Sequence, residues 1–282
     1  MKKALVILLT GAIMAMSVAC GGGSSSNTAS APKEEAAQEE QKEEETVVSE
    51  VAEDTAEVEM NVPEDPMTYE EYAAAAVDTE VVIKGAVQAK QAYYAEKSVA
   101  SVYLQDETGG AYFLYELPCT EKEYELLEVG KFIKVRGYKA MWPEVDGEVE
   151  ITEAIWQFED GEYIAEPEDV TALLGTDELV TKMNKKVVFK GVKVEPIKDK
   201  DGNDVAFNYG SKGTGTEGDD LYFNVSVNGQ TYTFTVESYL CGPDTDIYKA
   251  VKDFHVGDVI DLEGFLYWYE GPNPHITAVL AQ

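Results

Sequence analysis

Aromatic and amide side chains in residues 99–115, VASVYLQDETGGAYFLY, are the best candidates for ligand chemistry in this chain. The segment predicts two strands joined by a D-E-T-G-G turn, which is a β-hairpin. Side chains alternate between the two faces of a strand. With Val102 and Leu104 pointing inward, the outer face carries Tyr103, Gln105, Phe113 and Tyr115. Aromatic rings stack on bases or sugars, and an amide hydrogen-bonds to them, so this face predicts a binding platform.

Tyr138 and Trp142 are expected at the rim of the same groove, together with Tyr93 and Tyr94. The alternative is that the aromatic residues form cross-strand pairs that only stabilise a solvent-facing sheet. A one-residue slip in the strand register would also reverse the facing.

A second hairpin is predicted over residues 221–236, LYFNVSVNGQTYTFTV, with Asn228 and Gly229 at its turn. A two-residue turn pairs Val227 with Gln230 and sets the register of the whole hairpin. Its outer face is then rich in threonine, which suits a strand but not ring stacking. Of the two hairpins, the first is therefore the better candidate site.

The elements that must position these hairpins occur in the order strand, strand, strand, helix, strand, strand. Residues 81–87 precede the first hairpin, and residues 132–137 and 148–158 follow it. A capping box, Thr120 with Glu123, predicts the helix between strands three and four, with Leu126 and Leu127 on its buried side. A second capping box, Thr68 with Glu71, predicts a short helix before the first strand. This order is that of the OB-fold, a five-stranded Greek-key barrel.

The same landmarks occur twice. Val81-Val82-Ile83-Lys84-Gly85 returns as residues 187–191, Val129-Gly130 as residues 256–257, and Gly137-Tyr138 as residues 264–265. An ordered set of landmarks at nearly constant offset indicates an internal duplication. The predicted fold is therefore mainly β, with two tandem five-stranded OB-type Greek-key barrels, each with a short helix between strands 3 and 4. The predicted domains are residues 66–160 and 161–282.

These motifs resemble the OB-fold modules of bacterial surface lipoproteins. The resemblance is carried by K-G-x-V, by Y-L-Q-D-E-x-G-x-Y-F-L-Y and by V-G-x-x-I-K-V-x-G-Y, and it covers residues 70–160 well and 177–280 more loosely. It implies a fold, with nucleic-acid or carbohydrate binding as the broad tendency of the family, and no defined activity.

The first residues predict export and lipid anchoring. Lys2 and Lys3 precede an apolar run over residues 4–18 that is too short for a stable membrane span. The run ends at Ala19-Cys20, and Gly and Ser residues follow, which resembles the lipobox of bacterial lipoproteins, although Ser17 stands where leucine is usual. The resemblance implies that residues 1–20 are a signal peptide and that a lipid on Cys20 holds the protein at the cell membrane, facing outside the cytoplasm. An ordinary secreted protein that is cleaved near Cys20 is the alternative.

Charge limits the possible partners. Residues 21–65 have no aromatic residue and are rich in Glu, Ala and Gly, so they predict a disordered acidic tether. Of the net charge of −32, residues 66–282 keep −22, and Arg136 is the only arginine. Affinity for phosphate polymers and anionic membranes comes from Lys and Arg clusters, so this charge opposes both. A local basic patch stays open as an alternative, formed by Lys84, Lys90, Lys97, Lys134, Arg136 and Lys139.

Metal binding and catalysis have little support in the sequence. Asp199, Asp201 and Asn203 resemble the start of a calcium loop, but Asp204 and Gly210 stand where such a loop has its glycine and final glutamate. A hairpin-type turn is the alternative. Neither of the two histidines belongs to a Ser/His/Asp grouping. Cys119 and Cys241 are expected to be buried, inert thiols.

The leading hypothesis is a non-catalytic, monomeric binding or interaction lipoprotein without a cofactor, whose groove lies on the first barrel. Single-stranded nucleic-acid binding is the main alternative. Carbohydrate binding and a role as an envelope spacer are the others, and the partner is then a small ligand, a glycan, an oligonucleotide or an envelope protein.

Overall fold

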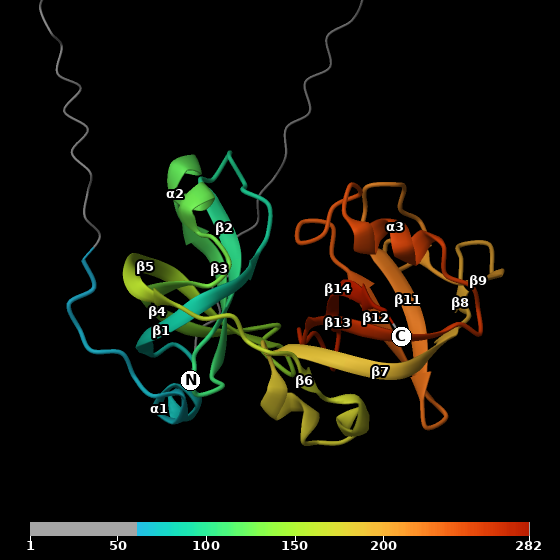
Figure 1. Ribbon diagram of the computed structural model, residues 1–282, viewed down its shortest axis with the longest axis horizontal. Coiled ribbons are helices and arrows are strands. Elements are labelled where there is room, and N and C mark those ends of the chain that lie inside the picture. The colour runs from blue at the N-terminus through green and yellow to red at the C-terminus, as the bar shows by residue number, and fades with distance from the viewer. Residues whose placement is uncertain (1–60, 282) are drawn as a thin grey trace, which may run out of the picture. The chain divides into compact units, whose positions relative to one another are not determined.

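The structure is a computed structural model, and it describes residues 61–281 (Figure 1). The predicted signal peptide, the lipobox at Cys20 and nearly all of the predicted tether lie outside the described residues. Within residues 61–281, no helix has both the length and the apolar character that crossing a membrane would need.

The first half of the described chain is a closed five-stranded barrel. Its strands follow one another around the barrel as β1-β2-β3-β5-β4. A short helix precedes the barrel, and a second one lies between β3 and β4, as predicted. The elements are α1 (Tyr69–Ala74), β1 (Glu80–Lys90), β2 (Val99–Gln105), β3 (Ala111–Pro118), α2 (Glu121–Leu126), β4 (Lys131–Trp142) and β5 (Glu148–Glu162).

The second half repeats this topology. Five strands close in the order β7-β11-β12-β14-β13, because β11 pairs with β7 as well as with β12. The two short strands β6 and β10 extend the sheet. The elements are β6 (Glu168–Asp169), η1 (Thr171–Leu173), η2 (Leu179–Lys182), β7 (Lys186–Glu195), β8 (Ile197–Lys198), β9 (Asp204–Val205), β10 (Asn208–Tyr209), β11 (Leu221–Val227), β12 (Gln230–Val236), α3 (Asp246–Lys252), β13 (Val259–Phe265) and β14 (His275–Leu280). Two tandem OB-type barrels are thus confirmed.

Both predicted capping boxes form. The hydroxyl oxygens of Thr68 and Thr120 each accept a hydrogen bond from the backbone amide three residues later, and the glutamate there accepts one from the threonine amide. These contacts satisfy amides that a helix leaves unpaired in its first turn. The prediction that Leu126 and Leu127 are both buried is only half correct. Leu127 is fully buried, but Leu126 is 51% exposed, since α2 ends after six residues and Leu126 has turned toward solvent.

The first hairpin has the predicted facing, and the second has the predicted register. In the first, Tyr103 lies opposite Phe113, and Leu104 lies opposite Tyr112. In the second, Val225 lies opposite Tyr232 around the Asn228-Gly229 turn. The alternating pattern therefore identified the side of each hairpin that enters the barrel, and the residues that do so are packed in two separate cores.

The duplicated glycines have a steric cause. Gly137 on β4 and Gly264 on β13 occupy equivalent places, where the strand crosses closely over its β5 or β14 partner. A Cβ atom on Gly264 would lie 2.2 Å from the His275 carbonyl oxygen, and one on Gly137 would lie 2.7 Å from the Thr152 carbonyl oxygen. Gly130 and Gly257, the other repeated pair, have φ angles of 94° and 101°, which favour glycine. Each barrel thus needs glycine at the same two points.

Candidate functional site

The predicted binding platform on the first hairpin is covered by the second barrel. Tyr103, Gln105 and Phe113 are 0%, 6% and 2% exposed. The Tyr103 ring stacks on Phe265 of β13 with a centroid distance of 4.4 Å, and Phe113 meets Tyr267 edge to face at 5.8 Å. The prediction of an open ligand face on these three residues is therefore wrong. They face outward from their own barrel as expected, but that outer face is a packed contact between barrels.

Polar contacts fix the same interface. The Tyr103 hydroxyl lies 3.1 Å from His275 Nδ1, and Gln105 Oε1 accepts a hydrogen bond from the Lys186 amide at 3.1 Å. Burial lowers the pKa of His275 to about 3, so its imidazole is neutral. The interface therefore carries no positive charge at this histidine.

A buried carboxylate completes the contact. Glu148 is fully buried, and its Oε2 accepts a hydrogen bond from the Trp268 amide at 2.8 Å. Glu148 Oε1 and Asn184 Oδ1 are both buried without a hydrogen-bond partner. Burial raises the pKa of Glu148 well above its ordinary value.

The remaining predicted site residues are exposed. Tyr115 is 44%, Tyr138 42% and Trp142 61% exposed. Tyr115 lines a cavity at the junction of the barrels, whereas Tyr138 and Trp142 line neither cavity described below. Of these three residues, the structure places only Tyr115 in a cavity.

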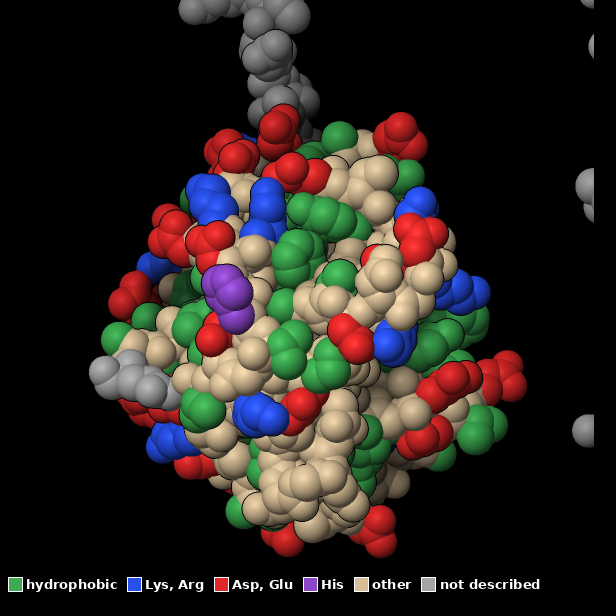
Figure 2. All heavy atoms as spheres, turned by 90° about the vertical axis from the view of Figure 1, so that its right-hand side faces the viewer, with side chains coloured by type: hydrophobic (Ala, Val, Ile, Leu, Met, Phe, Trp, Pro, Cys, Tyr) green, Lys and Arg blue, Asp and Glu red, His purple; other side chains and the backbone are tan. Residues whose placement is uncertain are grey.

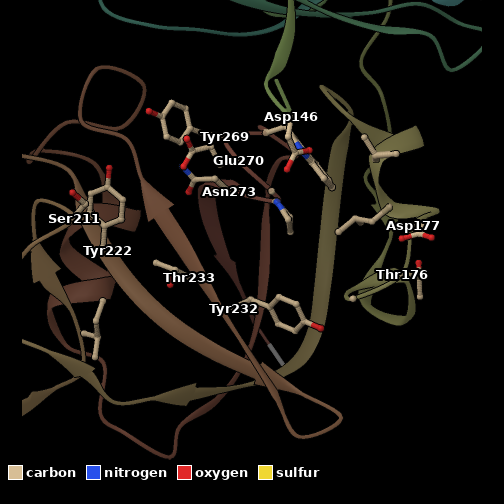
Figure 3. Close-up of a pocket in the computed structure, with 17 residues that line it drawn as sticks. Asp146, Thr176, Asp177, Ser211, Tyr222, Tyr232, Thr233, Tyr269, Glu270 and Asn273 are labelled. Carbon is tan, nitrogen blue, oxygen red and sulfur yellow. The ribbon is translucent and has the colours of Figure 1, made fainter. Parts of the chain in front are cut away.

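A groove lies instead on the second barrel, along the β11–β12 hairpin (Figure 3). Its volume is about 770 Å³. The connection between β7 and β11 contributes Ile197 and Ser211, and the connection between β13 and β14 contributes residues 269–273. Ligands of OB-type barrels usually bind at this place, across the second and third strands between these two connections.

The lining of the groove is aromatic, polar and acidic. Figure 3 shows Tyr269, Glu270 and Asn273 close together, and Thr176 and Asp177 on a separate segment at the right of the picture. None of the lining residues is a lysine, an arginine or a histidine. The members with rings or polar groups are Asp146, Thr176, Asp177, Ser211, Tyr222, Tyr232, Thr233, Trp268, Tyr269, Glu270 and Asn273.

A second cavity, of about 490 Å³, continues from this groove to the junction of the two barrels. The two cavities share Ser211, Tyr222, Tyr269 and Asn273. Five aromatic rings line the second one: Phe113, Tyr115, Tyr222, Tyr267 and Tyr269. Its one acidic lining residue is Glu237, at the end of β12, and burial raises the pKa of this carboxyl group to about 7.

The six basic residues that the sequence suggested as a local patch do not form an open one. Lys84 and Lys134 lie 3.7 Å from Glu159, and Arg136 lies 3.1 Å from Glu64. The other three also have partners on the protein: Lys97 pairs with Glu116, Lys90 donates to the Tyr124 carbonyl, and Lys139 donates to the carbonyls of Tyr72, Ala73 and Ala75. On the face of the second barrel that Figure 2 shows, acidic and basic side chains are interspersed as well.

The calcium-like segment forms a tight turn between β8 and β9. Asp199 Oδ1 accepts hydrogen bonds from the amides of Asp201 and Asn203, and its Oδ2 accepts one from the Asn203 side chain. These contacts account for the D-x-D-x-N pattern as turn chemistry. Among residues 61–281, no group of three or more His, Cys, Asp or Glu side chains is arranged to hold a metal ion.

Sequence reasoning missed the groove on the second barrel. The strand alternation that makes the outer face of this hairpin rich in threonine also puts Tyr222 on it, but a single tyrosine among threonines does not indicate a surface for ring stacking. Tyr269 gave no signal as a site residue, because it lies in a connection whose path depends on both barrels. The Gly271-Pro272 step in that connection was the available hint of an ordered loop.

No family model matches the chain, and no curated protein does. Solved structures show a partial likeness. One, described as "Structural mimicry for functional antagonism", has a TM-score of 0.35 and 12% identity and covers 76% of this chain and 100% of its own.

Two further structures are described as complexes with DNA. The Ifi202 HINa domain with 20bp dsDNA has a TM-score of 0.33 and 12% identity, and the alignment covers 70% of this chain and 94% of that one. A murine DNA binding protein bound with ds DNA has a TM-score of 0.32 and 14% identity, with 72% and 96% covered. Likeness at this level transfers no ligand to the present chain.

Proposed function

We propose that the protein is a non-catalytic binding lipoprotein of the bacterial envelope, which holds a neutral, hydroxyl-rich ligand such as an oligosaccharide in the groove of the second barrel. The observation that carries this proposal is the lining of that groove. Three tyrosines, several hydroxyl and amide groups and three carboxylates converge there without a lysine or an arginine.

The chemistry of these side chains favours sugars. Tyrosine rings provide flat apolar surfaces for the faces of sugar rings, and Thr233 and Asn273 offer hydrogen bonds at their edges. Carboxylates such as Asp177 and Glu270 accept hydrogen bonds from hydroxyl groups but repel phosphate. A neutral polyhydroxylated ligand meets all three requirements.

Display outside the cytoplasm is the part of the proposal that rests on sequence alone. The lipobox-like residues around Cys20 support lipid attachment, and residues 21–65 would hold the barrels away from the membrane. Metabolic labelling with a fatty-acid analogue, lost in a Cys20→Ser variant, tests this part independently of the ligand.

Isothermal titration with a panel of neutral oligosaccharides, among them cellohexaose and chitohexaose, tests the groove. At least one should bind, and Tyr269→Ala should weaken its binding, because the ring lines the groove and is 48% exposed. Tyr94→Ala is the matched control, since Tyr94 is 45% exposed and lines neither cavity. An equal loss of oligosaccharide affinity in both variants would show that the sugar does not bind in the groove. Release of shorter sugars during incubation would contradict a non-catalytic role.

Oligonucleotide binding is the second candidate, because OB-type barrels with exposed aromatics are a common platform for single strands. The pairing of the basic side chains on the first barrel counts against it. Titration with an oligothymidylate between about 50 and 200 mM salt decides the matter, since phosphate contacts make affinity fall steeply with salt. Salt-dependent binding, with none to the sugars, would replace the first proposal by the second.

A further inference from the structure

The cavity at the junction of the barrels has features that a neutral ligand does not need. Its walls come from both barrels: Phe113 and Tyr115 from β3, and Tyr222, Tyr267 and Tyr269 from the second barrel. Tyr115 and Tyr269 are 44% and 48% exposed and lie at its mouth, whereas Phe113 is buried. The rings therefore enclose a space that solvent can reach.

The charged groups at this cavity are acidic, and none of its lining residues is positively charged. Glu237 is the acidic lining residue, and Asp220 lies close enough to help raise its pKa. Glu150 lies close enough to contribute to the raised pKa values of Tyr115 and Tyr267. The lining contains no lysine or arginine, and its histidine, His275, is held neutral by burial.

We infer that this junction cavity is a binding site for a small alkylated ammonium ion, held over the faces of its tyrosine rings and beside the Glu237 carboxylate. Cations are attracted to aromatic faces, and recognition of quaternary ammonium groups by several rings is the best-known use of that attraction. The inference does not depend on the proposed sugar groove, because Glu237 and Tyr115 line only the junction cavity.

The hydrogen bonds of Glu237 favour an alkylated ammonium over a metal ion. Its Oε1 accepts from the Tyr239 amide at 3.1 Å, and its Oε2 accepts from the Leu240 amide at 2.8 Å and from Gln91 Nε2 at 3.2 Å. Most of its acceptor capacity is thus used by the protein, and what it offers a ligand is mainly charge. An ion with methyl groups needs charge and apolar contact, whereas a metal ion needs free lone pairs from several ligands.

Titration of the full chain with tetramethylammonium and choline tests the site, and 3,3-dimethylbutan-1-ol serves as the uncharged isostere of choline. Choline should bind, and the alcohol should bind at least several-fold more weakly, because it lacks the charge. Phosphocholine carries the phosphate of a lipid or polymer headgroup. If it binds as tightly as choline, the natural ligand is such a headgroup, and if it binds much more weakly, the ligand is a free ammonium compound. Binding of the alcohol as tight as that of choline, or no binding of either cation, would overturn the inference.

Variants locate the site. Tyr115→Ala should weaken choline binding roughly 2- to 30-fold, the range of one cation–π contact. Glu237→Gln should also weaken it, and Tyr94→Ala and Asp244→Asn, outside the cavity, should not. Because Glu237 also anchors two backbone amides, Tyr115→Ala keeps the test valid if the glutamine variant fails to fold. Unchanged binding in Tyr115→Ala would place the ion elsewhere.

Acidification supplies a further readout. Glu237 faces Asp220 and Gln91, and its carboxyl group gains a proton as the pH falls through about 7. Choline should therefore bind more tightly at about pH 8 than at about pH 6. The difference should shrink in Glu237→Gln to what the nearby Glu150 carboxyl group contributes, because burial raises the pKa of Glu150 to about 7 as well. Sugar binding in the groove should not follow this change, so the two proposals can fail separately.

Discussion

The ring of Tyr103 stacks on the ring of Phe265 with a centroid distance of 4.4 Å and an interplanar angle of 18°. One residue lies on β2 of the first barrel and the other on β13 of the second. Both side chains are buried, and together with Phe113 they form a small apolar cluster separate from the two barrel cores. This cluster is the centre of the contact between the barrels, and it occupies the face where the first barrel would otherwise bind a ligand.

Loss of this stacking should destabilise the protein. Tyr103→Ala removes a fully buried aromatic side chain and leaves a cavity between the barrels, which costs about 3–5 kcal/mol. Tyr103→Phe keeps the ring but leaves His275 Nδ1 without its hydrogen-bond partner, at a cost of about 1–3 kcal/mol. Urea unfolding followed by tryptophan fluorescence measures both. The exposed control Tyr94→Ala should stay within about 0.5 kcal/mol of the wild type. If Tyr103→Ala were no more destabilising than this control, the interface would not be packed in solution.

Protonation of Glu148 should stabilise the same contact. Glu148 Oε1 is buried without a hydrogen-bond partner, and burial disfavours the charged form of the carboxyl group, so a proton removes the cost of a buried charge. Its pKa in the folded protein is raised by burial, while in the unfolded chain it is near 4.5. The stabilisation is therefore complete below the unfolded value and is lost as the pH rises through the folded one. Glu150 and Glu237, with pKa values raised to about 7, act in the same direction.

Glu148→Gln tests this directly. At about pH 5 the variant should be about as stable as the wild type, and at about pH 8.5 it should be more stable, by about 1–3 kcal/mol, because no charge is buried. The urea midpoint at the two pH values is the measurement. Glu166→Gln, an exposed carboxylate, should show no such difference. A variant that is less stable than the wild type at both pH values would contradict a protonated Glu148.

Much of the fold could be predicted because its signals are local. The capping boxes of Thr68 and Thr120, the Asn228-Gly229 turn and the strand alternation around Val102 and Leu104 each depend on residues within a few positions of one another. Such contacts form in the same way whatever the rest of the chain does. The duplication then made a barrel topology the consistent interpretation of both halves.

The candidate site could not be predicted because its contacts are not local. Alternation identified Tyr103 and Phe113 as outward-facing but carried no information about what covers them. Phe265 and His275, which cover Tyr103, lie more than 160 positions away in the sequence. Tyr269 becomes a groove residue only because the β13–β14 connection lines the same groove as the β11–β12 hairpin. The site therefore follows from how the strands and connections of the two barrels pack, which no single segment encodes.

Gly264 should tolerate no side chain. An added Cβ would lie 2.2 Å from the His275 carbonyl oxygen and 2.8 Å from Ile276 Cα, so the backbone of β13 or β14 would have to move. Gly264→Ala should cost roughly 1–3 kcal/mol, the usual range for overpacking. It should also disturb the Tyr103–His275 contact, because His275 moves with its backbone. Gly242→Ala is the control, since its added Cβ would lie 3.4 Å from the Ser238 carbonyl oxygen. Equal urea midpoints for the two variants would contradict the close approach of the strands.

Cys119 and Cys241 should be unreactive in the folded protein. Both are free thiols that are buried, and burial raises the pKa of each to about 11. The thiolate is the reactive form, so at about pH 8 very little of it is present even before access is considered. Iodoacetamide should leave both cysteines unmodified under native conditions and alkylate both in concentrated urea, as read by mass spectrometry from the peptides that contain Cys119 and Cys241. Because the two thiols lie in separate barrel cores, the urea dependence of each reports the opening of its own barrel. Rapid alkylation of either cysteine without urea would contradict the packing of that barrel.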